Sequence, residues 1–183
     1  MPRPKKDSAV PGARERLVTV YIDLMERSQK APSVSDIAKA ASCNRDTFYY
    51  HFKGIEDISQ AAMETLMPKE VADALVAYLF GDAEHVTLNS RLARRAQETY
   101  ALIARHAELK PYAQARLKEL WTGRLNLPQS GISKRRSLLL EFVSCGTVET
   151  LTSNARDESP LPINACMETI GDFLRTSVLD ELR

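Results

Sequence analysis

The sequence is poor in the residues and patterns that build β-sheets. Its 183 residues include only seven glycines. In no part of it do Val, Ile and Thr alternate with polar residues over several segments joined by hairpin turns, as the strands of a sheet protein require. With 44% of its residues apolar, the chain still has enough hydrophobic side chains for a core, which excludes disorder of the whole chain. We therefore expect an all-α protein of about nine helices.

Cysteine is also scarce. The three cysteines, Cys43, Cys145 and Cys166, lie far apart in the sequence, and no Cys-x-x-Cys pair occurs. An odd number of widely spaced cysteines indicates neither a disulfide framework nor a zinc site. The sequence predicts free thiols, no metal site and no cofactor.

Long apolar runs are missing as well. No stretch approaches the roughly 20 apolar residues that span a bilayer, and the first residues lack the apolar core of a signal peptide. The sequence therefore predicts a cytoplasmic protein with no membrane partner.

Net charge gives little guidance, because the formal charge at pH 7 is only +1. Its distribution is more informative, since Arg3, Lys5 and Lys6 stand among the first six residues without any acid. We expect residues 1–12 to form a flexible basic arm. Such an arm is either a solvated terminus or a segment that follows DNA phosphates or enters a minor groove, and in the second case its contribution would fade with salt.

Two helix start signals follow each other closely within residues 32–52. Ser33 and Asp36 have the spacing of a capping box, and Asn44 is a strong N-cap residue. The segment between the two helices, residues 42–44, must then be a tight turn. The sequence predicts a pair of short helices joined by that turn.

The second helix of the pair, residues 45–52, has aromatic side chains on more than one face. Phe48 and Phe52 lie four residues apart and are predicted to pack inward. The side chains left to face outward or to flank the core are Arg45, Asp46, Tyr49, Tyr50 and His51. Adjacent tyrosines and a histidine suit phosphate oxygens at a groove edge, which indicates a helix-turn-helix DNA reader. An ordinary pair of core helices with solvated polar residues has the same caps and spacing.

At these residues the chain resembles the TetR family of bacterial transcriptional regulators. The family motif runs approximately as Thr-hydrophobic-x-x-Ile-Ala-x-x-Ala, a small-residue turn, and Thr-hydrophobic-Tyr-x-His/Tyr-Phe. The matching segments here are Ser33-Val34-Ser35-Asp36-Ile37-Ala38-Lys39-Ala40-Ala41 and Thr47-Phe48-Tyr49-Tyr50-His51-Phe52. The resemblance covers roughly Ala13 to Leu66. It implies a regulator, commonly a repressor, that binds a palindromic DNA operator as a dimer and that a small molecule can release.

Two departures from the family motif affect the expected DNA contacts. Asp46 stands where the family usually has glycine, and Ile55 stands where it has a lysine that commonly touches DNA phosphate. Lys53, two residues before Ile55, is the candidate replacement for that lysine.

The expected DNA-binding residues divide into two groups. Side chains near the N-terminus of a recognition helix usually reach base edges, so the predicted base readers are Arg45, Asp46 and Tyr50. Arg45 can pair bidentately with guanine. Carried over from the matched motif, the predicted phosphate or sugar contacts are Ser35, Thr47, Tyr49, His51 and Lys53.

The rest of the chain predicts further helices. We expect a helix-turn-helix DNA-binding domain over residues 13–60, opened by a bracing helix over 13–28, and a helical ligand-binding and dimerisation domain over 61–183. The helices expected after the recognition helix are one opening at residue 55, one ending near 80, one over 89–106, one from 111 to a loop at 126–131, and two over 133–154 and 163–182.

The last two of these helices have apolar stripes wider than a lone surface helix needs. The intramolecular core accounts for part of this surface, and the TetR resemblance implies a four-helix interface of two copies for the rest. The predicted interface residues are Leu139, Phe142, Gly146, Met167, Ile170, Leu174 and Val178. The two recognition helices of such a dimer would enter successive major grooves about 34 Å apart.

The TetR resemblance implies an effector pocket in residues 61–183, on the number and position of the helices there. No sequence motif identifies the ligand. Taken singly, each candidate residue is more readily explained as core packing than as a ligand contact. The candidate lining residues for a small apolar or amphipathic effector are Met63, Tyr78, Tyr100, Ile103, His106, Trp121, Phe142 and Glu149.

The two alternative functions are a small helical enzyme and a protein-binding module. The sequence does not favour the enzyme, because His51, His85 and His106 are scattered and no catalytic or phosphate-binding motif occurs. A module that binds a protein in place of DNA would use the same aromatic surface, including Tyr49 and Tyr50.

Overall fold

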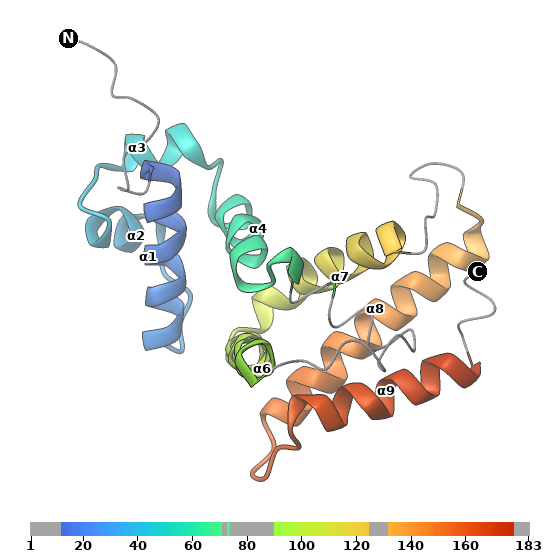
Figure 1. Cartoon of the computed structure of the whole chain (residues 1–183). Helices are drawn as coiled ribbons and strands as arrows, with labels where there is room; N and C mark the ends of the chain where they lie inside the picture. The colour runs from blue at the N-terminus through green and yellow to red at the C-terminus, as the bar shows by residue number, and fades with distance from the viewer. Residues whose placement is uncertain (1–11, 71–72, 74–89, 125–131, 178–183) are drawn as a thin grey trace. The chain divides into compact units, whose positions relative to one another are not determined.

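In the computed structural model, the described part of the chain comprises residues 12–70, 73, 90–124 and 132–177. These residues form eight α-helices and one short 3-10 helix, with no strand among them, which confirms the predicted all-α class (Figure 1). The elements are α1 (Ala13–Arg27), α2 (Val34–Ala40), α3 (Arg45–His51), α4 (Ile55–Leu66), α6 (Ser90–Arg105), η2 (Ala107–Leu109), α7 (Lys110–Arg124), α8 (Lys134–Ala155) and α9 (Ile163–Ser177). The helix expected to end near residue 80 lies outside the described residues.

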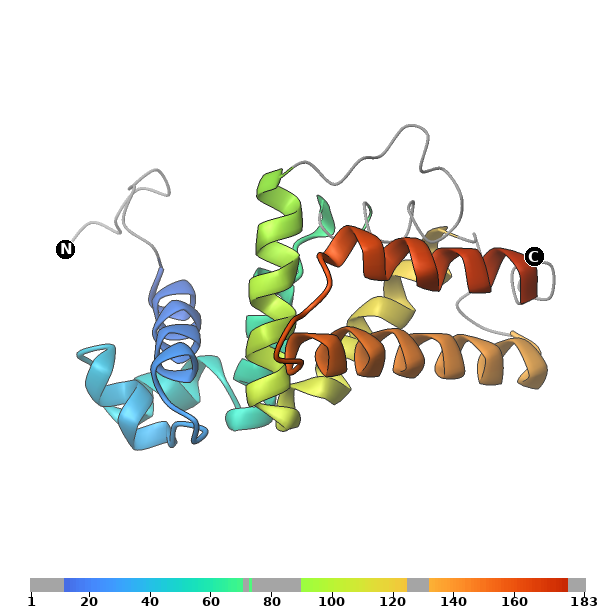
Figure 2. The ribbon, with the colours of Figure 1, turned by 90° about the horizontal axis from the view of Figure 1, so that it is seen from below.

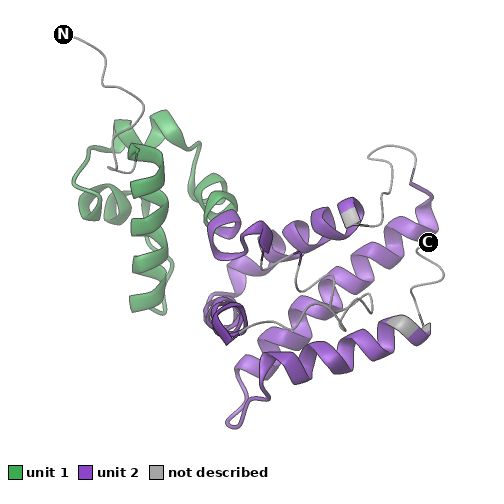
Figure 3. Cartoon of the chain, in the orientation of Figure 1, with its two compact units in different colours: residues 1–62 green, residues 63–183 purple. Residues whose placement is uncertain are grey.

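The chain divides into two compact units, residues 1–62 and residues 63–183 (Figure 3). The division falls inside α4, between Ala62 and Met63. The sequence predicts the boundary after residue 60, two residues before this division.

Unit 1 has a small core between α1, α2, α3 and the first part of α4. The buried side chains of α1 recur at helical spacing, so one face of this helix packs inward. The core residues of the unit are Leu17, Val18, Tyr21, Met25, Ile37, Ala38, Ala41, Phe48, Phe52, Ile58, Ala61 and Ala62. The inward packing predicted for Phe48 and Phe52 is confirmed, because both are at most 1% exposed.

One buried hydrogen bond links the two ends of unit 1. The Tyr21 hydroxyl on α1 lies 2.8 Å from the Ser59 hydroxyl on α4, and Ser59 also donates to the Ile55 carbonyl at 2.7 Å. Both polar groups are therefore satisfied inside the core, as buried hydroxyls need to be.

In unit 2, α8 packs against α6 and α7, and α9 lies beside it (Figure 2). The central side chains are Tyr100, Ile103, Leu117, Trp121, Leu140, Val148 and Met167, all at most 1% exposed. Two side chains of α6 bind the C-terminal end of α4. Arg95 donates a hydrogen bond to the Thr65 carbonyl, and Thr99 donates one to the Leu66 carbonyl. These bonds satisfy carbonyls that the end of a helix leaves without partners.

No helix in the described ranges combines the length and the apolar character needed to cross a lipid bilayer.

Candidate nucleic-acid interface

The start of α2 is fixed by a reciprocal cap. The Ser33 hydroxyl accepts from the Asp36 backbone N–H at 3.2 Å, and the Asp36 carboxylate accepts from the Ser33 N–H at 2.9 Å and from its hydroxyl at 2.6 Å. The hydrogen bond from the Ser33 side chain is the main cause that lowers the pKa of Asp36. Ser35, which was predicted to contact phosphate, is exposed in the first turn of the same helix.

A tight turn sets the angle between α2 and α3. The Cys43 N–H donates to the Ala38 carbonyl at 2.9 Å, and the Ser42 N–H donates to the Lys39 carbonyl at 3.1 Å. Ser42 has a φ of 54°, in the left-handed region that side chains other than glycine rarely adopt. The direction of α3 is thus set by backbone hydrogen bonds.

The start of α3 is capped as expected from Asn44. The Asn44 side-chain carbonyl accepts from the Thr47 backbone N–H at 2.8 Å and from the Thr47 hydroxyl at 2.6 Å. The Thr47 hydroxyl thus donates within the cap, and a phosphate contact from it would take the place of this hydrogen bond.

The predicted base readers lie together on the exposed face of α3. Arg45 and Asp46 are exposed in its first turn, and Tyr49 and Tyr50 follow them one turn later. Tyr50 is 84% exposed and Tyr49 is 50% exposed. Residues spaced by three and four positions share one side of a helix, so these four side chains form a continuous polar and aromatic surface.

The two tyrosines are supported differently. The Tyr49 ring stands edge-on against the buried Phe48, with 5.5 Å between ring centroids, whereas the Tyr50 ring stands edge-on against the half-buried His51, at 4.9 Å. Tyr49 is therefore positioned by the core, and Tyr50 projects from the helix with nearly its whole ring available.

The remaining predicted phosphate contacts lie at the far end of α3. His51 is half-buried and Lys53 is exposed just after the C-cap residue Phe52. The Lys53 backbone N–H donates to Asp57 in the first turn of α4 at 2.9 Å. The backbone at Lys53 is thereby fixed while its side chain extends into solvent.

A further cation at this end of α3 was missed from the sequence. Arg14, exposed in the first turn of α1, has its guanidinium carbon 5.2 Å from the centroid of the Phe52 ring. No local pattern links Arg14 to Phe52, since the contact joins distant parts of the sequence.

The structure does not assemble the predicted effector pocket. Met63, Tyr100, Ile103, His106 and Trp121 are buried side chains of unit 2. Phe142 lies instead at the surface with 61% of its area exposed, and Tyr78 falls outside the described residues. Glu149 is also at the surface, ion-paired with Lys110 and Arg156. The prediction is therefore wrong for Phe142 and Glu149.

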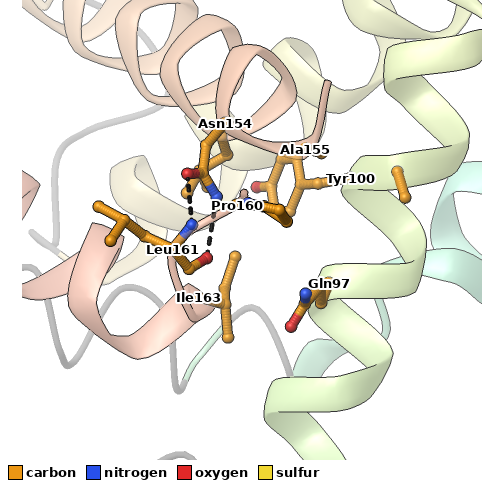
Figure 4. Close-up of a pocket in the computed structure, with 9 residues that line it drawn as sticks. Gln97, Tyr100, Asn154, Ala155, Pro160, Leu161 and Ile163 are labelled. Atoms are coloured by element: carbon orange, nitrogen blue, oxygen red, sulfur yellow. Dashed lines mark hydrogen bonds between the residues drawn. The ribbon is translucent and has the colours of Figure 1, made fainter. Parts of the chain in front are cut away.

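A cavity of about 50 Å³ lies elsewhere in unit 2, between α6, the end of α8 and the α8–α9 connection (Figure 4). Tyr100 is its one lining residue among those predicted. Asn154 closes the connection beside it, donating to the Leu161 carbonyl and accepting from the Leu161 N–H, each at 3.0 Å. Burial raises the pKa of the Tyr100 hydroxyl, which has no hydrogen-bond partner among the residues that the structure describes. That hydroxyl is fully covered, so a molecule in the cavity does not reach it.

The predicted dimer residues separate into two sets. Met167 and Leu174 are buried within unit 2, which corrects their assignment, because a second copy cannot reach them. Leu139 and Ile170 are half-buried, and Phe142 and Gly146 are exposed. Val178 is outside the described residues.

Among the residues that the structure describes, no group of His, Cys, Asp or Glu side chains is arranged to hold a metal ion. No protein-family model matches this chain, and no curated protein matches its sequence.

Proposed function

We propose that this chain is a cytoplasmic, TetR-like transcriptional regulator, most simply a repressor, that binds a palindromic DNA operator as a homodimer. The observation that supports this function best is the surface of α3. Two buried phenylalanines hold the helix, the Asn44 cap fixes its start, and Arg45, Asp46, Tyr49 and Tyr50 stay exposed on one side. A plain surface helix gains nothing from two exposed tyrosines, whereas a recognition helix uses them at a groove.

In this proposal α3 enters the major groove with its first turn toward the bases. Arg45 donates bidentately to guanine, Asp46 accepts from a cytosine amine, and Tyr50 reaches a third base edge. The phosphate contacts come from Ser35, Tyr49, His51 and Lys53. They fix the orientation of the protein on DNA without reading its sequence.

The homodimer is supported by an apolar stripe on α8. Leu138 and Phe142 are 62% and 61% exposed, and they lie one turn apart. One further turn on, a Cβ added to Gly146 would meet no atom within 4 Å, so this backbone is open to close approach. Self-pairing of this stripe through a two-fold axis would bury it and would join two copies of the chain, each with its own α3, in one assembly.

The proposal assigns no effector. The cavity beside Tyr100 measures about 50 Å³, while an apolar cavity that binds benzene measures about 150 Å³. A molecule that occupied it would have to be smaller than benzene or would have to widen the site.

The test is an electrophoretic mobility shift with DNA from upstream of the chain's own gene, run over a range of salt concentrations with a polyanion competitor. Site-selective retardation that weakens with salt is the expected result. If no promoter fragment is retarded even at low salt, the exposed tyrosines are better explained as a protein-binding surface and the proposed function fails.

A further inference from the structure

The Arg14 side chain is held at the C-terminal end of α3 by an aromatic ring. Its guanidinium lies 5.2 Å from the centroid of Phe52, which is 1% exposed and caps α3. A planar guanidinium stacks on an aromatic face through cation–π attraction, which limits the positions that the flexible side chain adopts. The guanidinium of Arg14 is thus held beside α3 before any ligand binds.

No protein group neutralises this cation within the described residues. Arg14 makes no ion pair or hydrogen bond there, whereas Arg94, Arg116 and Arg156 each pair with a glutamate. The neighbouring Glu15 carboxylate is engaged in accepting from the Gly12 N–H at 3.1 Å. The donors of Arg14 are therefore available to an anion.

A second cation follows Phe52 in the sequence. Lys53 is the next residue, and it is exposed. Of the two acids in the first turn of α4, Glu56 and Asp57, Asp57 accepts from the Lys53 backbone N–H. Arg14 and Lys53 come from distant parts of the sequence, and both are therefore at the end of α3 that the proposed function places against the DNA backbone.

We propose that Arg14 is a DNA phosphate contact that Phe52 holds in position. The inference rests on the proposed function and adds a binding residue to it. A guanidinium donates two parallel hydrogen bonds to phosphate oxygens, so a fixed Arg14 loses less side-chain freedom on binding than a free one. The contact is with the backbone and carries no base preference.

The experiment compares Arg14→Met, Arg14→Lys and the matched control Arg16→Met. Arg16 is an exposed arginine of the same helix, two residues later and so on nearly the opposite face. The probe is a fluorescent random-sequence duplex of about 30 base pairs, titrated by anisotropy from about 50 to about 200 mM salt. Thermal melting of each full-length variant is recorded alongside.

We expect Arg14→Met to weaken binding roughly three- to tenfold and to flatten the salt slope by about one. Arg14→Lys should keep the slope and lose part of the affinity, because an ammonium lacks the planar stack on Phe52. Arg16→Met should match the wild type. Unchanged melting temperatures would support a role in binding over a role in folding.

Three outcomes would overturn the inference. The first is an equal effect of Arg14→Met and Arg16→Met, which would mean that only net charge matters. The second is an affinity loss in Arg14→Met with an unchanged salt slope and a lowered melting temperature, which would make Arg14 a structural brace. The third is the absence of salt-dependent binding by the wild type, which would end the proposed function as well.

Discussion

Arg45 and Lys53 are exposed cations at opposite ends of one short helix, and they have different proposed partners. Arg45 starts α3, where side chains reach base edges. Arg45→Ala is therefore expected to weaken binding to the operator much more than binding to random DNA, by about 1–3 kcal/mol on the operator. Anisotropy titrations with both DNAs measure the two losses.

Lys53→Ala provides the contrast for this measurement. A lost phosphate contact should lower the affinity for both DNAs alike and flatten the salt slope by about one. Lys69→Ala removes the same charge from unit 2, where Lys69 pairs with Asp73, and should change neither quantity. Equal losses on both DNAs for Arg45→Ala would remove its assignment as a base reader.

Glu149 makes the stability of unit 2 depend on pH. Its carboxylate accepts a hydrogen bond from Lys110 on α7 and lies 3.4 Å from Arg156. The hydrogen bond from Lys110 is the main cause that holds the pKa of Glu149 below its usual value of 4.5. A carboxyl group with a lowered pKa in the folded state stabilises it above the unfolded-state pKa, and this contribution is lost as pH falls through the folded-state pKa.

Glu149→Gln is therefore expected to melt at a slightly lower temperature than the wild type at neutral pH. The difference should shrink as pH falls from about 5 to about 3, because the wild-type carboxylate becomes protonated. The effect is small, since the pair is exposed to solvent. Calorimetry over this range measures it, with Glu168→Gln, an exposed glutamate of α9, as the control. A difference that stays constant with pH would contradict the mechanism.

At the scale of helices and turns, local sequence predicted the ends of elements well. The capping box of Ser33 and the cap of Asn44 form as expected, and α8 begins at Lys134, directly after Ser133. Caps are predictable because donor and acceptor lie within a few residues of each other. The conformation of Ser42 was not predictable from its residue type, because it follows from how α2 and α3 pack together.

Ser42 supplies a test of that turn. Ser42→Gly should stabilise the protein by roughly 0.5–1 kcal/mol, since glycine adopts a φ of 54° without the steric penalty that a Cβ brings. The greater freedom of glycine in the unfolded chain offsets part of this gain. Urea denaturation measures the free energy of unfolding, and Ser42→Ala is the control that keeps the penalty. A destabilised glycine variant would show that the Ser42 side chain contributes contacts of its own.

At the scale of the whole molecule, the stripe on α8 determines whether the proposed dimer forms. Phe142→Glu places a charge in the middle of that stripe, and we expect it to raise the dimer dissociation constant by about 30-fold or more, as loss of a central apolar anchor does. Operator affinity should fall with it, because a monomer engages only one half-site. Sedimentation at several concentrations measures the assembly.

Leu161→Glu is the matched control for Phe142→Glu. Leu161 is another exposed apolar residue, 56% accessible, on the connection between α8 and α9. We expect Leu161→Glu to leave the dimer dissociation constant unchanged. If both variants stay dimeric, the α8 stripe is not the interface, and the surface of α9 around Phe173 becomes the next region to test.

The predictions made for unit 2 were less accurate than those for unit 1, and the residues involved explain why. Phe48 and Phe52 could be assigned to the core because a short amphipathic helix has one apolar side. Helix α8 has apolar residues on several sides, so periodicity did not distinguish the exposed Phe142 from buried neighbours such as Leu140. Met167 and Leu174 were assigned to a dimer surface for another reason: the apolar stripe of α9 does not reveal whether it is covered by the same chain or by a second copy, and these two side chains face the unit's own core.

The sequence by itself determined the all-α class, the caps and turn around α3, and the inward and outward sides of that helix. These features depend on hydrogen bonds and side-chain spacings within a few residues, which a linear pattern contains. Only the tertiary structure decided that Arg14 lies over Phe52 and that Glu149 pairs with Lys110. Both contacts join residues far apart in the chain, so they could not be known before the packing of the helices was known.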